Sequence, residues 1–340
     1  MCKIENKKIH VPELDVSKGI AIIFMILGHS IQISYGNSDG FFDNIVFKFI
    51  YSFHMPLFMM ISGYLFNTTV KRKTTKKILI ERCSSLLIPL LSWNLIINGK
   101  DFVNAGGVLY KIVKFGYHCI VSYWFLWAVL YCSIGSILVF KIVNRKLQIV
   151  CLTLLLLATF FTPDLFNSEC YKFMFPCFIS GYYMKEYGNQ IKNTFDYKKG
   201  LLIGAVLFTA LFMFYKRNGY IYIGYWSLLR KGAVGIFIWD IYRTIIGIIG
   251  SVCILLSVRI FIPLKENGVI QEIGKNSMGI YIISMQLNIV LRWLAVRFNI
   301  TWWGMIIETI AILAISYLTT KVISKIKILN FLLLGRRKNE

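Results

Sequence analysis

The chain has 340 residues, of which 57% are hydrophobic and 16% are charged, and its formal net charge is +22. An average soluble domain carries about 25% charged residues, so this chain has too few charges to solvate a globular surface. The composition therefore excludes an ordinary soluble protein. We also predict no nucleic-acid partner, because the cations lie in short runs between apolar segments, where they are typical of membrane topology.

Long apolar segments recur along the whole chain. A membrane-spanning helix needs about 20 mostly apolar residues, because the hydrocarbon core is about 30 Å thick. In lipid such segments satisfy their amides only as helices, and they lack the alternating pattern of a barrel. We therefore predict an all-α, polytopic membrane protein, a single domain over residues 1–340 with about ten transmembrane helices. They are expected at residues 16–34, 45–66, 79–98, 121–140, 147–162, 171–187, 200–216, 235–257, 277–297 and 302–323.

Lysine and arginine gather in alternate connections between these segments, notably in residues 71–77, 141–146, 185–199 and 321–338. The positive-inside rule places such connections in the cytoplasm, so we predict a multi-pass protein of the inner or plasma membrane with both termini cytoplasmic. The segment 216–231 disagrees, because it carries four cations on the side assigned as external. Either a helix is miscounted there or those cations face a functional cavity.

The first predicted helix carries an ion-pair candidate, Asp15 and Lys18, at its entrance and His29 far inside. Lys18 and His29 are eleven residues apart, which returns almost to the same helical face and separates them by roughly 16 Å. Lys18 is expected near the cytoplasmic interface and His29 near the membrane middle. An ionisable group at that depth by default faces a cavity or a partner, and imidazole readily accepts a proton near neutral pH. Taken alone, a hydrogen bond from His29 to a neighbouring helix explains the residue equally well.

A second pattern occurs twice, as FHMPLFMMISGY in residues 53–64 and as FPCFISGY in residues 175–182. Convergent helix composition explains this likeness better than a duplicated half. The small pairs Ser62-Gly63 and Ser180-Gly181 would let helices approach closely.

Together these segments resemble the acyltransferase-3 family of membrane-bound O-acyltransferases, and within it the sugar O-acetylases similar to fucose 4-O-acetylase. Residues 15–29 look like the family's opening helix, in which a basic residue is followed by ten residues and a histidine. Residues 53–66 are similar to its Phe-x-Met-Pro-Leu-Phe segment ending in Ser-Gly-Tyr. The loop leading through Arg82 to LLIP, the YWFL segment at residue 123 and the IGKNSMGIY segment at residue 273 continue the likeness in the family's order.

Two positions depart from the family's pattern. The basic residue of the first helix is usually Arg in the family and is Lys18 here, which keeps the charge but loses bidentate phosphate binding. Related members often carry a histidine after the Ile-Tyr segment, where this chain has Ile282, Ile283 and Ser284. Any role of that histidine cannot be carried over.

The resemblance implies an O-acetyltransferase that moves an acetyl group from cytoplasmic acetyl-CoA to a hydroxyl of a cell-envelope polysaccharide or its lipid-linked precursor. Lys18 and Arg82 would bind the phosphates of CoA. His29 would be the catalytic residue, either as the general base on the acceptor hydroxyl or by first taking the acetyl group itself. The implied partners are acetyl-CoA, a carbohydrate acceptor and the lipid bilayer, and no metal is expected.

Three further residues are candidates for substrate binding. Asp15 is expected either to hold Lys18 or to form a plain interfacial ion pair with it. His54, beside the helix-kinking Pro56, would position the acceptor, although a packed or hydrogen-bonded histidine is slightly favoured. Trp124 would stack on a sugar, although an interfacial anchor is the commoner use of such a residue.

Two other functions and one buried pair complete the predictions. A membrane transporter of a glycan or acyl group ranks second. Transporters are often built from two related halves, and the only duplicated element in this sequence is the short Ser-Gly-Tyr pattern. A nonenzymatic component of an envelope assembly machine ranks third, because it gives no reason to bury His29 in line with an interfacial cation. Asp240 and Arg243, spaced i,i+3 in a membrane segment, are expected to neutralise each other.

Overall fold

The computed structural model describes residues 11–36, 38–100, 107–161, 167–191, 195–226, 234–263, 268–298 and 302–336. Within these ranges every regular element is a helix, which confirms the all-α prediction. The α-helices are α1 (Pro12–Ser34), α2 (Ile45–Arg72), α3 (Thr75–Asn98), α5 (Val108–Val121), α6 (Trp124–Ile137), α7 (Arg145–Ala158), α8 (Ser168–Ile191), α9 (Tyr197–Phe212), α10 (Val234–Phe261), α11 (Val269–Lys275), α12 (Ser277–Phe298), α13 (Trp302–Lys325) and α14 (Lys327–Leu334). Short 3-10 helices are η1 (Asp39–Asp43), η2 (Val139–Lys141), η3 (Thr159–Phe161), η4 (Arg217–Gly219) and η5 (Ile221–Ile223).

Each of the ten predicted ranges overlaps a helix, but ten membrane crossings are not confirmed. Among the described residues, five helices are long and apolar enough to cross a membrane, namely α1, α2, α3, α10 and α13. The pair α5 and α6 would make a sixth, bent by 76°. Helices α7 and α9 have only 14 and 16 residues, fewer than the roughly 20 that a full crossing needs. The chain is therefore a polytopic membrane protein with at least five candidate spans.

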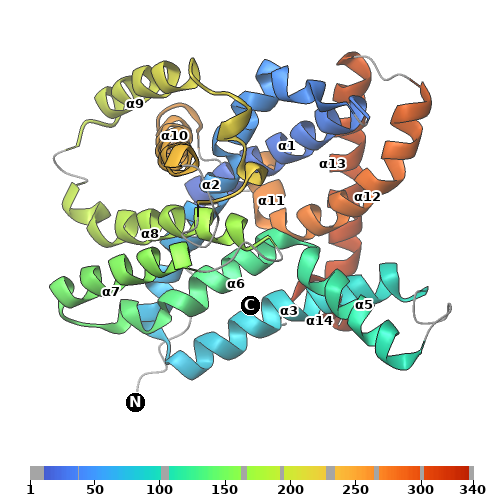
Figure 1. Ribbon diagram of the computed structural model, residues 1–340, viewed down its shortest axis with the longest axis horizontal. Coiled ribbons are helices and arrows are strands. Elements are labelled where there is room, and N and C mark those ends of the chain that lie inside the picture. Colours follow the sequence, from blue (N-terminus) through green and yellow to red (C-terminus); the bar gives the residue numbers. More distant parts are fainter. Residues whose placement is uncertain are drawn as a thin grey trace.

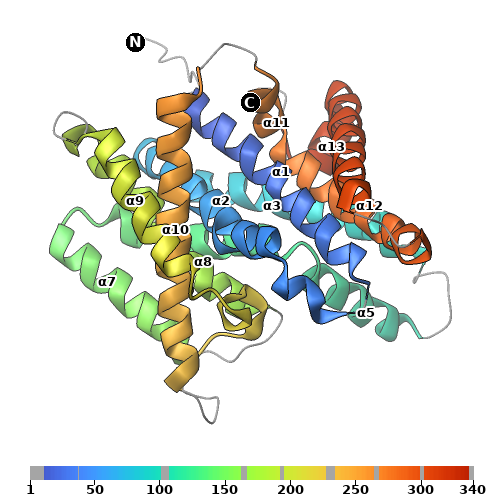
Figure 2. The same ribbon diagram turned by 90° about the horizontal axis from the view of Figure 1, so that it is seen from above.

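Helices α1 and α2 lie at the centre of the bundle and pack side by side (Figures 1 and 2). Pro12 starts α1 where a missing amide hydrogen costs no helical bond. Phe24 of α1 contacts Phe49 and Phe53 of α2 edge-to-face, with ring centroids 6.2 Å and 5.9 Å away. Gly28 lets α2 come closer still, since a Cβ there would lie 2.8 Å from Cε2 of Tyr51. These contacts fix which residues of α2 face the second half of α1.

The two Ser-Gly-Tyr segments pack against each other where α2 crosses α8. A Cβ on Gly63 would collide with the carbonyl oxygen of Phe178, and a Cβ on Gly181 would collide with that of Met60. The contact is thus reciprocal, because each glycine lies against the backbone of the other helix. The prediction that these small residues permit close helix approach is confirmed.

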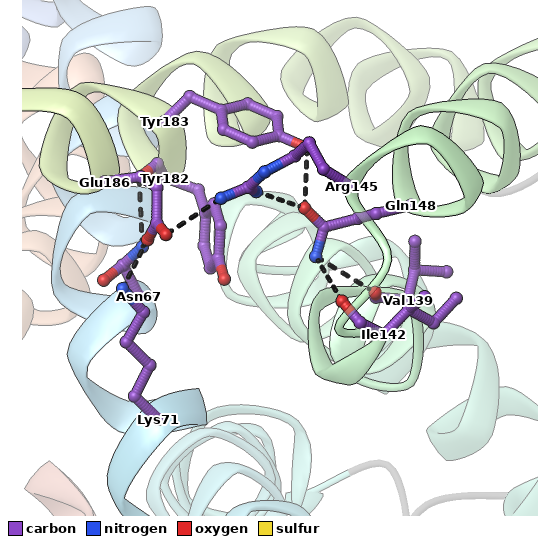
Figure 3. Close-up of polar contacts among 9 residues, drawn as sticks. All are labelled: Asn67, Lys71, Val139, Ile142, Arg145, Gln148, Tyr182, Tyr183 and Glu186. Carbon is purple, nitrogen blue, oxygen red and sulfur yellow. Dashed lines mark hydrogen bonds and ion pairs between the residues drawn. The ribbon is translucent and has the colours of Figure 1, made fainter.

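Basic connections meet at one end of the bundle, which we call the basic end. Glu186 of α8 accepts hydrogen bonds from Arg145 of α7 at 2.9 Å and from Asn67 of α2 at 2.7 Å, and it also pairs with Lys71 (Figure 3). The Lys141 ammonium, after α6, donates to the carbonyl oxygen of residue 73, between α2 and α3, at 2.9 Å. Three of the basic segments predicted to share one side of the membrane therefore lie together.

Candidate functional site

His29 lies five residues before the end of α1 and faces α2. Its Nδ1 is 3.5 Å from the Tyr51 hydroxyl oxygen, and the two rings meet edge-to-face with centroids 6.3 Å apart. Gln32, one turn further along α1, is a second polar neighbour of the ring. His29 is only partly buried.

His54 lies behind Tyr51, one turn along α2. It is 2% exposed, and its Nδ1 donates to the carbonyl oxygen of Ile50 at 2.8 Å. The His54 and Tyr51 rings are 4.7 Å apart and nearly perpendicular. Sequence reasoning favoured a packed, hydrogen-bonded histidine at this position, and that is what the structure shows. Its place against Tyr51, which contacts His29, makes His54 a support for the site.

Four aromatic residues form a continuous surface beside His29, which we call the aromatic wall: Tyr51, Trp124, Tyr220 and Tyr222. The Tyr220 ring lies 5.1 Å from Tyr51 and 5.2 Å from Tyr222, and Tyr222 lies 6.0 Å from Trp124. Tyr222 is 43% exposed although it has these neighbours, so part of its ring is open to a ligand. Trp124 is thereby connected to the site of His29. Sequence reasoning missed Tyr51, Tyr220 and Tyr222, although the tyrosine density of residues 215–225 was a signal.

The buried pair Asp240 and Arg243 fixes the loop that carries Tyr220 and Tyr222 of this wall. The two side chains are ion-paired, which confirms the expected neutralisation. Arg243 also donates to the carbonyl oxygens of Tyr220, at 3.2 Å, and of Gly224. Asp240 accepts from the backbone amide of Trp226 at 2.7 Å. The loop thus gains the partners that a non-helical backbone needs in a membrane protein.

In segment 216–231, the structure shows the partners of Arg217. Arg217 pairs with Asp39 at 2.7 Å, and its guanidinium lies 4.6 Å from the Phe42 ring centroid. This pair joins η4 to η1, the connection between α1 and α2. Arg230 and Lys231 lie outside the described residues.

The predicted donor-side cations lie on two helices. Lys18 pairs with Asp15 at 2.5 Å near the start of α1. Because α1 is unbroken from Pro12 to Ser34, Lys18 and His29 keep their predicted alignment along one face, about 16 Å apart. Arg82, on α3, lies with its guanidinium 5.2 Å from the ring centroid of Phe66 on α2.

A hollow of about 260 Å³ opens at the start of α3, close to Arg82 in the chain. It is lined by Thr74, Lys76, Lys77, Ile80 and Glu81. These residues add positive charge to the basic end, but none of them belongs to the group around His29.

Several buried polar side chains have hydrogen-bonding atoms without a partner among the described residues, and Ser30, Asn288 and Glu308 are among them. Ser34 of α1 donates to the Met305 sulfur of α13 at 3.2 Å. Ser30 and Glu308 each lie one turn from this contact, on the facing sides of the two helices. Sequence reasoning missed them, although a lone glutamate in an apolar segment was a usable signal.

Comparisons with known proteins identify the family of the chain. The chain matches the family model described as an acyltransferase domain over residues 11–321. Nodulation protein NolL of Sinorhizobium fredii is 43% identical over 120 residues, which cover 34% of this chain and 33% of that protein. Nodulation protein NolL of Mesorhizobium japonicum is 35% identical over 173 residues, which cover 49% of this chain and 46% of that protein. The matched segments therefore span less than half of either relative. No solved structure matches the chain.

Proposed function

The chain belongs to the acyltransferase family whose domain it matches over residues 11–321, and from this premise we propose that it is a membrane-bound O-acetyltransferase. It would transfer acetyl from acetyl-CoA at the cytoplasmic face to a hydroxyl of a cell-envelope polysaccharide or its lipid-linked precursor. The observation that carries the proposal is the single helix α1, with the cation Lys18 near one end and the imidazole of His29 near the other.

The donor would bind from the basic end. Lys18 and Arg82 are charged groups suited to the phosphates of CoA, and Asp15 holds Lys18 in place. With its phosphates there, the donor's pantetheine arm would extend along α1 and carry the thioester toward His29. The positive-inside rule makes the basic end cytoplasmic, where acetyl-CoA is available.

His29 would act as the general base. If its Nδ1–H donates to the Tyr51 oxygen, the lone pair lies on Nε2, which would accept the proton of the acceptor hydroxyl. The acceptor oxygen then attacks the thioester carbonyl carbon, the C–S bond breaks, and the CoA sulfur leaves and takes the proton from Nε2. In an alternative mechanism, Nε2 first takes the acetyl group from the thioester and then passes it to the acceptor hydroxyl.

The acceptor would bind against the aromatic wall. Aromatic faces stack on the apolar faces of sugars, and Tyr222 and Trp124 present such faces beside His29. Ser30 and Glu308 offer unused hydrogen-bonding atoms to sugar hydroxyls near the same part of α1. His54 would act through Tyr51, whose ring it contacts.

Glycan mass spectrometry of cells with and without the protein tests this proposal. The expected result is an increment of one acetyl group that requires the wild-type chain and is abolished by His29→Ala, because the proposed mechanism takes its base from His29. His118→Ala, a change on the distant helix α5, is the matched control and should keep the increment. If His29→Ala keeps the increment at normal membrane insertion, the mechanism is wrong. If the wild type produces none, the function is wrong.

A further inference from the structure

The C-terminal part of the described chain returns to α3 and is fixed there by its backbone. The Trp93 indole donates to the carbonyl oxygen of Leu333 at 3.0 Å, at the end of α14. Gly335 has a φ of +63°, and a Cβ on it would collide with the carbonyl oxygen of Ser85. Glycine is the residue that fits this backbone conformation and close approach without strain. The path of the backbone at Gly335 therefore determines where Arg336 lies.

Arg336 reaches the junction between α11 and α12. Its guanidinium donates to Asn276 Oδ1 at 3.2 Å and to the carbonyl oxygen of Lys275 at 2.8 Å. Both acceptors are neutral, and no carboxylate pairs with Arg336 among the described residues. A guanidinium has five N–H donors, so this one keeps both its charge and free donors.

The same junction touches the start of α1, the helix that carries Lys18. A Cβ on Gly274 would collide with the carbonyl oxygen of Asp15, the partner of Lys18, so α11 and the start of α1 touch. On the other side, Ser85 lies one turn after Arg82 on α3 and donates to its carbonyl oxygen at 3.3 Å. Arg336 therefore lies between the segments that carry Lys18 and Arg82.

The nearby carboxylates are already matched by other cations. Asp15 pairs with Lys18, and Glu272 pairs with Lys321 at 2.8 Å and with Lys275 at 2.9 Å. Hydrogen bonds from Lys321 and Lys275 lower the pKa of Glu272, so this carboxyl stays ionised and fully engaged. Arg336 is thus a surplus positive charge in a partly buried place, an environment that favours an anionic ligand.

We propose that Arg336 binds a phosphate of the CoA donor, together with Lys18 and Arg82. This inference rests on the proposed function and extends its donor site. Lys18 replaces an arginine of the family's pattern and cannot form a two-pronged phosphate pair, whereas the guanidinium fork of Arg336 can. Arg336 also lies beyond residues 11–321, the segment that matches the family model.

Calorimetric titration of the purified full chain with CoA tests the inference. Arg336→Gln should weaken CoA binding about tenfold or more, the effect of losing a charged hydrogen bond, and should make the affinity less sensitive to salt. Arg336→Lys should recover part of the affinity because it restores the charge. Lys327→Gln, on the exposed start of α14, is the matched control and should bind CoA as the wild type does.

An alternative is that Arg336 only fastens the C-terminal segment. In that case Arg336→Gln lowers the melting temperature of the ligand-free protein, and Arg336→Lys restores none of the lost CoA affinity. That result, or an unchanged CoA affinity in Arg336→Gln, would overturn the inference. Its failure is distinct from that of the proposed function, because the latter fails if the wild type itself binds no CoA or transfers no acetyl.

Discussion

Tyr51 connects more of the candidate site than any residue named by the sequence motifs. Its hydroxyl approaches Nδ1 of His29, and its ring contacts the rings of His54 and Tyr220. A hydroxyl at this place selects which nitrogen of His29 is free. Tyr51 is thus a positioning residue for the proposed base.

Tyr51→Phe removes the hydroxyl group and keeps the ring, so it separates the contributions of the two. The ring packing of the aromatic wall should remain, while the contact with His29 is lost, so kcat should fall about tenfold, the effect of about 1.4 kcal/mol. The KM for acetyl-CoA should stay unchanged, because Tyr51 is not part of the donor site. Steady-state kinetics with Tyr131→Phe on α6 as a control measures both quantities. An unchanged kcat in Tyr51→Phe would remove Tyr51 from the mechanism.

At this scale the sequence predicted contacts between near neighbours on one helix. The pairs Asp15–Lys18 and Asp240–Arg243 follow from i,i+3 spacing, and the structure confirms both. The sequence could not predict that Arg243 holds a loop or that Arg336 reaches α11. Both side chains bond backbone oxygens that only tertiary packing brings near them.

At the scale of elements, the crossing of α2 and α8 is a close helix contact built from a recognisable sequence pattern. Each helix places a glycine against the other's backbone, at Gly63 and Gly181. Without this approach α2 would be displaced from α8, and Tyr51 and His54, on the same helix, would shift relative to His29. The crossing therefore supports the geometry of the site from a distance.

Gly63→Ala should destabilise the protein by about 2 kcal/mol or more, because the added methyl group has to displace backbone and not a flexible side chain. Thermal unfolding in detergent should show a lower melting temperature. Gly188→Ala, on α8, is the matched control, since its added Cβ would meet nothing within 4 Å. Equal melting temperatures for the two variants would contradict the close crossing.

Hydropathy located the long helices but missed the short ones. The ranges 16–34 and 45–66 agree closely with α1 and α2, because apolar runs of that length have one solution in lipid. The shorter α11 and α14, which place Lys275 and Arg336, were not predicted, since a seven- or eight-residue helix gives no span-length signal. The bend between α5 and α6 was also missed, and it depends on Tyr123 at a φ of 50°.

At the scale of the whole molecule, the proposed site lies between two differently built ends. The basic end gathers Lys71, Arg145 and the other cations of the connections, and Lys18 lies on its side of α1. The other end of α1 leads to the loops joined by Arg217 and Asp39 and to the aromatic wall. The proposed donor and acceptor would therefore approach His29 from opposite ends of the same helix.

Inverted membrane vesicles supplied with radiolabelled acetyl-CoA test this central claim most directly. Their outer surface is the former cytoplasmic face, so vesicles with the wild-type protein should incorporate label into a glycan fraction, and mild alkali should release it, as expected of an ester. Vesicles with His29→Ala should incorporate none, and right-side-out vesicles should incorporate none until they are opened. Equal labelling by wild type and His29→Ala, or labelling of intact right-side-out vesicles, would contradict transfer from a cytoplasmic donor through His29.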